Sequence, residues 1–106
     1  MISSNDFQLS YLPLFEDDLN EIIDYILITL RNPTAALRLL DRVESAILKR
    51  LKAPDSYASF PSTRPRKNSY YRIIVGNYAI FYVLIGRTME VRRILYLKRN
   101  LDKLLK

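Results

Sequence analysis

Three short runs of β-branched and aromatic residues dominate the C-terminal half of the chain. They cover residues 69–75, 77–85 and 88–97, and Gly76-Asn77 and Gly86-Arg87 stand between them. Val, Ile, Tyr and Phe suit a pleated, half-buried surface, and Gly and Asn adopt the positive φ that tight hairpins require. Consecutive strands joined this closely run antiparallel. The pattern therefore predicts a three-stranded meander, one face of which the upstream residues must cover.

Upstream of the meander, a helical pattern follows a short alternating segment. Apolar residues at alternate positions predict a first strand over residues 7–12, which is free to pair with any strand of the sheet. Pro13 suits the first position of a helix, because its missing N–H costs nothing there. A helix from Pro13 to about Arg31 carries one apolar stripe at spacings of three and four. The stripe consists of Leu19, Ile22, Ile23, Ile26 and Leu30.

A second helix is predicted directly after the first. Asn32 is a suitable N-cap, and Pro33 is a suitable first helical residue. The apolar stripe of this helix consists of Ala36, Leu39, Leu40, Val43, Ile47 and Leu51. We expect Leu39, Val43 and Ile47 to be buried. A link of only about two residues makes the two helices an antiparallel hairpin.

The periodic pattern breaks between residues 53 and 68, where three of the five prolines lie. Long irregular loops in compact domains are usually functional or mobile. This loop ends in a basic cluster of Arg64, Arg66 and Lys67. The cluster is a candidate binding surface for an anionic target, and a solvated loop that shields a sheet edge explains it equally well.

Alternation along the meander separates a more polar face from an apolar one. Under strict alternation Arg72, Arg92 and Tyr96 belong to the more polar face. The helical hairpin covers only one face, so we expect the other to remain open as a shallow basic surface with embedded aromatic residues. Beyond residue 97 the sequence KRNLDKLLK predicts a short basic helix or tail.

These elements define one α+β domain over residues 1–106. We expect an N-terminal strand, an antiparallel two-helix hairpin packed on one face of the meander, and a short C-terminal helix.

Composition excludes several kinds of chemistry. The chain has no cysteine and no histidine, so it lacks thiolate metal sites and the commonest general base at neutral pH. Two glycines are too few for a phosphate-binding loop. The acids at residues 16–18 fit a helix N-terminus better than a metal site. We therefore expect no cofactor and no metal.

The N-terminus has no secretory signal, and no apolar run is long enough to span a bilayer. A cytoplasmic location without membrane contact is the resulting expectation.

The net charge of +6 conceals a strong asymmetry. Residues 1–30 hold six acids and no base, whereas residues 52–106 hold twelve bases and three acids. Such a division suggests an anionic partner for the C-terminal half, although solubility alone explains a basic chain as well.

The order of these motifs resembles that of the RelE/ParE toxin superfamily. Residues 13–22, PLFEDDLNEI, are similar to the P-x-A-x-x-D-L-x-x-I opening of that family. Residues 32–36, NPTAA, look like the start of its second helix. Tyr71-Arg72, residues 77–82 and residues 94–100 are similar to its strand pair and its basic C-terminal signature. The likeness extends over nearly the whole chain.

The resemblance implies an α+β fold in which the helical hairpin packs on one face of a twisted antiparallel sheet of about four strands, the first strand included. It also implies a toxin of a type II toxin–antitoxin pair, of the kind that stabilises plasmids. It implies a hetero-oligomer with a cognate antitoxin, usually an acidic and partly disordered protein. ParE-type members inhibit growth by binding DNA gyrase, and RelE-type members are ribosome-dependent mRNA endoribonucleases. Residues 77–82 look more like the ParE type, and Ala79 stands where RelE-type nucleases commonly have arginine. Gyrase is therefore the expected target, with the ribosome and its mRNA as the alternative.

Candidate site residues follow from the resemblance and from charge. The gyrase expectation favours a chain that is not an enzyme. If the chain is instead a nuclease, the resemblance points to Tyr96, Arg99 and Arg72 as catalytic residues. An unperturbed tyrosine titrates near 10, so Tyr96 would need neighbouring cations to lower its pKa. Target-binding candidates under either activity are Arg64, Arg66, Lys67, Arg92 and Lys98.

Overall fold

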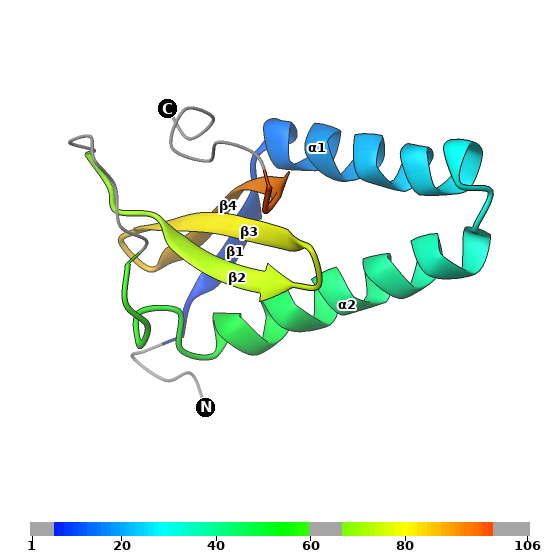
Figure 1. Ribbon diagram of the computed structural model, residues 1–106. Coiled ribbons are helices and arrows are strands. Elements are labelled where there is room, and N and C mark those ends of the chain that lie inside the picture. The colour runs from blue at the N-terminus through cyan, green and yellow to red at the C-terminus, as the bar shows by residue number, and fades with distance from the viewer. Residues whose placement is uncertain (1–5, 60–66, 99–106) are drawn as a thin grey trace.

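The structure, a computed structural model, describes residues 6–59 and 67–98. Its elements are β1 (Gln8–Tyr11), α1 (Pro13–Asp24), a π-helical turn η1 (Tyr25–Thr29), α2 (Pro33–Leu51), β2 (Tyr71–Val75), β3 (Tyr78–Ile85) and β4 (Thr88–Tyr96) (Figure 1). The α+β class and the order of elements are confirmed. The predicted C-terminal helix and the cluster residues Arg64 and Arg66 lie outside the described residues.

The helical hairpin forms as predicted and extends beyond the sheet (Figure 1). Pro13 begins α1, and η1 continues the same helical course with a wider hydrogen bond from Leu30 N to the Tyr25 carbonyl (3.1 Å). Arg31 reverses the chain with a φ of 51°. The Asn32 side chain then accepts a hydrogen bond from Ala35 N (3.1 Å), which caps α2 at its first turn.

Four strands form one open sheet in the order β1-β4-β3-β2. The meander is antiparallel, with Val75 opposite Tyr78 across the first turn and Ile85 opposite Thr88 across the second. The strand β1 runs parallel to β4, so the sheet is mixed and the wholly antiparallel sheet predicted was wrong in this detail. The long excursion through both helices allows this direction, because a parallel pair requires a crossover and not a hairpin.

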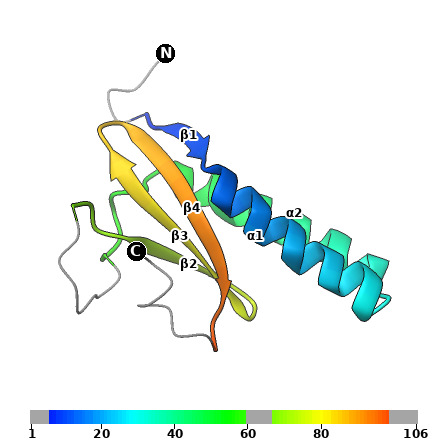
Figure 2. The same ribbon diagram turned by 90° about the horizontal axis from the view of Figure 1, so that it is seen from above.

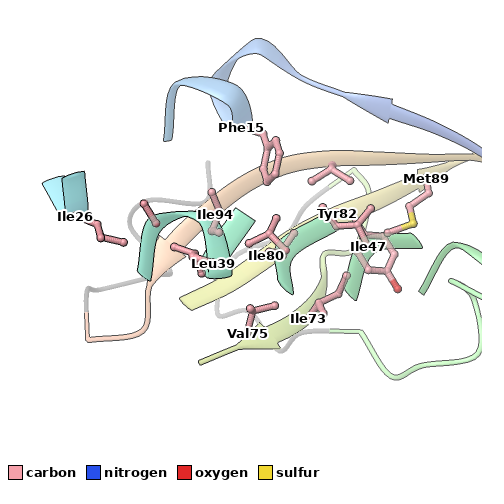
Figure 3. Packing of buried hydrophobic residues seen from close by; sticks show 13 residues of the cluster. Phe15, Ile26, Leu39, Ile47, Ile73, Val75, Ile80, Tyr82, Met89 and Ile94 are labelled. Atoms are coloured by element: carbon pink, nitrogen blue, oxygen red, sulfur yellow. The ribbon is translucent and has the colours of Figure 1, made fainter. Parts of the chain in front are cut away.

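Both helices lie on one side of the sheet (Figure 2) and close the main core against it. Leu39, Val43 and Ile47 of α2 are buried, as predicted. They pack in one cluster with side chains from all three meander strands, among them Ile73, Ile80, Tyr82, Met89 and Ile94 (Figure 3).

A second, smaller cluster lies on the opposite face of the sheet. Its members are Tyr70, Ala79, Phe81, Val83 and Leu95, all buried. The expectation of a shallow, open basic surface on this face was therefore wrong in its centre, where the side chains are apolar. Arg72 lies on this face opposite Phe81 and is exposed.

A β-bulge in β4 changes which residues face the helices. Tyr82 pairs with Val91 but Phe81 pairs with Arg93, so one residue, Arg92, is extra on β4. The bulge lets Val91 and Ile94 both join the main core. Strict alternation through β4 was consequently a wrong assumption.

The same bulge determines the side on which Tyr96 lies. Tyr96 pairs with Tyr78, which packs against the main core. Tyr96 is thus on the helix side of the sheet, and Arg72 is on the other. The prediction that these two residues share one open face was wrong.

Candidate functional site

Asp18 of α1 fastens the helix to the bulge in β4. Arg93 Nε donates to Asp18 Oδ2 (2.7 Å), Arg93 Nη2 donates to Oδ1 (2.9 Å), and Ile94 N donates to Oδ2 (3.2 Å). Since β1 ends at Tyr11, opposite Val91, this part of β4 has no neighbouring strand on that side. The carboxylate therefore takes over a backbone donor that a longer β1 would have bonded.

Electrostatics agree with a structural role for this ion pair. The hydrogen bond with Asp18 raises the pKa of Arg93, and burial opposes that rise only in part. Asp18 is 8% exposed. In the described residues, no group of three or more potential ligand side chains could hold a metal ion. The sequence Val91-Arg92-Arg93-Ile94 carried a signal for this arrangement. In a regular strand Val91 and Ile94 would point to opposite faces of the sheet, so two arginines between two core residues indicate a bulge.

Arg92 turns to the face opposite the helices. Its Nε donates to Glu90 Oε2 (2.8 Å), and its guanidinium carbon lies 5.9 Å from the centre of the Tyr70 ring. Burial lowers the pKa of Arg92, but hydrogen bonds with Tyr70 and Glu90 outweigh it and raise the pKa overall. Arg92 is thus a charged side chain whose position is fixed at the edge of the smaller apolar cluster.

Tyr96 lines a groove between α1 and the end of β4. We call it the α1–β4 groove; its volume is about 760 Å³, and its lining is Asp18, Glu21, Ile22, Tyr25, Asn77, Tyr78, Ile94, Leu95 and Tyr96. The Tyr78 and Tyr96 ring centres are 5.8 Å apart. Burial raises the pKa of Tyr78, and the neighbouring Tyr96 and Tyr25 raise it further. The groove is aromatic and acidic, with no lysine or arginine among these lining residues.

Arg72 lies on β2, an outer strand of the sheet. The Arg50 guanidinium donates from Nη1 to the Arg72 carbonyl (3.2 Å), and so ties the end of α2 to this edge. Lys67 and Lys98 are both exposed, the first in the loop before β2 and the second just after β4. Arg64, Arg66 and Arg99 fall outside the described residues.

Sequence reasoning missed a network centred on Tyr82. The Tyr82 hydroxyl donates to the Pro54 carbonyl (2.7 Å) and accepts from Arg50 Nη1 (3.0 Å). The Arg50 guanidinium carbon also lies 3.5 Å from the centre of the Tyr57 ring. Together these contacts fix the first part of the long loop against α2 and β3. The only signal in the sequence was a tyrosine at a core position of β3.

The described residues do not bring a nuclease constellation together. Cleavage by attack of a 2′-oxygen requires an acid or base beside groups that stabilise the phosphate. Tyr96 faces the α1–β4 groove, whereas Arg72 and Arg92 lie on the opposite face. The arrangement offers surfaces and grooves for binding, and no acid–base pair among these candidates.

Comparison with solved structures defines the class of fold. The chain is similar to a structure described as the chromosomal ParDE toxin–antitoxin system from P. aeruginosa, with a TM-score of 0.75 and 18% identity over 90% of this chain and 100% of that one. It is also similar to a chain of the RelB-RelE antitoxin-toxin complex from Methanococcus jannaschii, with a TM-score of 0.56 and 22% identity over 92% and 99% of the two chains. The fold is therefore that of the RelE/ParE toxins.

A family model identifies the branch. The model of the ParE toxin of the type II toxin–antitoxin system parDE matches residues 9–101. The chain belongs to the ParE toxin family. No curated protein matches it significantly. In the part of the chain that the structure describes, no helix is both long enough and apolar enough to cross a membrane.

Proposed function

We propose that this ParE-family chain inhibits growth by binding DNA gyrase, without catalysing a reaction, and that a cognate antitoxin neutralises it. The observation that carries the proposal is the separation of Tyr96 from Arg72 by the thickness of the sheet. A nuclease of the RelE type would need such groups in one place. Membership of the ParE family supports the same choice.

The target surface we infer is the basic side of the C-terminal half. Arg92, held by Glu90 and Tyr70, and the exposed Lys67 and Lys98 supply cations on or beside the sheet. Charge of this kind steers an anionic partner and accelerates encounter more than it adds affinity.

The antitoxin is a further part of the proposal, because the similar structures are described as a ParDE system and an antitoxin-toxin complex. Within residues 6–59 and 67–98, β2 has a neighbouring strand on one side only, and Ile74 on it is 51% exposed. An exposed edge of this kind accepts an added strand. Acidic residues of the antitoxin would then lie near the basic surface.

Inducing the chain in cells, while DNA supercoiling and translation are followed side by side, tests the target. We expect supercoiling to change first. If translation stops first and mRNA is cut at the ribosome, the endoribonuclease alternative replaces the proposal.

Two variants sharpen this test. Tyr96→Phe removes only a hydroxyl, so growth inhibition should persist, whereas a nuclease that uses this hydroxyl would lose its toxicity. Arg99→Ala should reduce toxicity under either mechanism and serves as the positive control. Circular dichroism and antitoxin binding must remain normal for both variants, so that a folding defect is not mistaken for a lost activity.

A further inference from the structure

A second groove lies between the two helices, on the other flank of α1. We call it the interhelical groove; its volume is about 380 Å³, and its lining is Tyr11, Phe15, Glu16, Leu19, Leu40, Asp41, Val43, Glu44 and Ile47. Its floor is apolar, because Phe15, Val43 and Ile47 belong to the main core. Grooves of this form accept the apolar face of an amphipathic helix.

The rim of the interhelical groove is acidic in a basic protein. Three carboxylates, those of Glu16, Asp41 and Glu44, line it, and no lysine or arginine does. Among residues 6–59 and 67–98, no ion pair neutralises any of the three. Burial, followed by the charge of Glu44, raises the pKa of Tyr11 beside them. An acidic antitoxin is therefore a poor occupant, and a cationic amphipathic segment is a good one.

The chain itself contains such a segment at residues 98–106, KRNLDKLLK. It carries four bases and one acid, and Leu101, Leu104 and Leu105 recur at spacings that place them on one side of a helix. The other stretches outside the described residues do not qualify. Residues 1–5 have no charged side chain, and residues 60–66 contain two prolines that oppose a helix.

The position of Tyr96 favours the segment of a second copy over the chain's own. Tyr96, the last residue of β4, lines the α1–β4 groove, so α1 stands between it and the interhelical groove. A helix with its side chains is about 10–12 Å across. Leu97 N donates to the Asn77 carbonyl (2.9 Å), so only residues 98–100 separate this fixed point from Leu101. Fully extended, three residues span at most about 11 Å. This length does not exceed the width of α1, so the leucines of the same chain would not reach along the groove. A segment from another molecule docks without this constraint.

We propose that the interhelical groove binds the basic C-terminal segment, residues 98–106, of a second copy of this chain. The leucines fill the apolar floor, and the lysines pair with the three carboxylates on the rim. The groove is a surface that neither the basic side of the sheet nor the β2 edge includes, and of the four bases in the segment only Lys98 and Arg99 are also proposed to serve toxicity.

Sedimentation of the full chain over a range of concentrations, at low and moderate salt, tests the proposal. We expect reversible self-association that weakens at least tenfold in Glu44→Lys. Asp55→Lys, which reverses an exposed acid outside the groove, is the matched control and should leave the association constant unchanged. Combining Glu44→Lys with Lys103→Glu and Lys106→Glu should recover much of the loss.

A labelled peptide of residues 98–106, titrated into the full chain and followed by fluorescence anisotropy, gives a second readout. Binding should weaken in Glu44→Lys and persist in Asp55→Lys. If the chain stays monomeric at about 100 µM and low salt, the proposal is overturned. This holds also if the reason is that the segment of the same molecule fills the groove. Equal peptide binding by both variants overturns it as well, because the peptide would then be held elsewhere by charge alone.

Discussion

Replacing Asp18 by alanine tests whether one carboxylate holds α1 to the bulged strand. The change leaves the Arg93 guanidinium, whose side chain is only 17% exposed, without its bidentate partner. It also leaves the buried Ile94 N–H without an acceptor. Removing one member of a buried pair costs about 3–5 kcal/mol, and an unsatisfied buried N–H costs about 1–3 kcal/mol.

Arg93 keeps some access to water and the N–H loses only one long bond, so the lower part of these ranges applies. We expect Asp18→Ala to reduce the free energy of unfolding by about 3 kcal/mol. In urea this corresponds to a fall in the unfolding midpoint of about 1–3 M for a domain of this size.

Equilibrium urea unfolding monitored by circular dichroism measures the effect, and two variants provide the controls. Asp17→Ala removes a neighbouring exposed acid, and it should change the free energy of unfolding by less than about 0.5 kcal/mol. Asp18→Asn keeps an oxygen that can accept from Ile94 N but removes the charge, so it should lie between wild type and Asp18→Ala. If Asp18→Ala behaves like Asp17→Ala, the carboxylate does not hold the bulge and our account of β4 is refuted.

Three further predictions follow from the core, the Tyr82 network and the charge of the molecule. Val43→Ala should lower the melting temperature more than Arg72→Ala, because truncating a buried side chain costs about 2 kcal/mol or more whereas Arg72 is exposed; the opposite order would invert our assignment of the faces. Burial raises the pKa of Tyr82 in the folded protein above 10.0, although Arg50 opposes the rise. The contribution of the neutral Tyr82 hydroxyl to the free energy of unfolding should therefore be fully present below pH 10.0, and it should be lost as the pH rises through the pKa of the folded state. Tyr82→Phe should flatten that decline in a series of urea titrations across alkaline pH. Raising salt should slow capture by the cognate antitoxin in stopped-flow mixing while leaving most of the complex intact, and complete dissociation at moderate salt would show that apolar docking does not hold it.

The sequence by itself determined the elements, because their signals are local. The spacing of apolar residues in α2 decided which side chains are buried, and Asn32 and Pro33 marked where that helix begins. Gly76 and Gly86 adopt positive φ in the two turns of the meander, where the sequence predicted them. The order of these signals also indicated the family that the family model then established.

Only the tertiary structure decided the direction of β1, the bulge in β4 and hence the surroundings of Tyr96. Pairing of β1 with β4 depends on where the helical hairpin returns the chain, which no local pattern records. The bulge places Val91 and Ile94 in one core and is held by Asp18, 75 positions before Arg93 in the chain. Since one inserted residue exchanges the two faces of every position beyond it, the candidate site could not be assembled correctly from alternation alone.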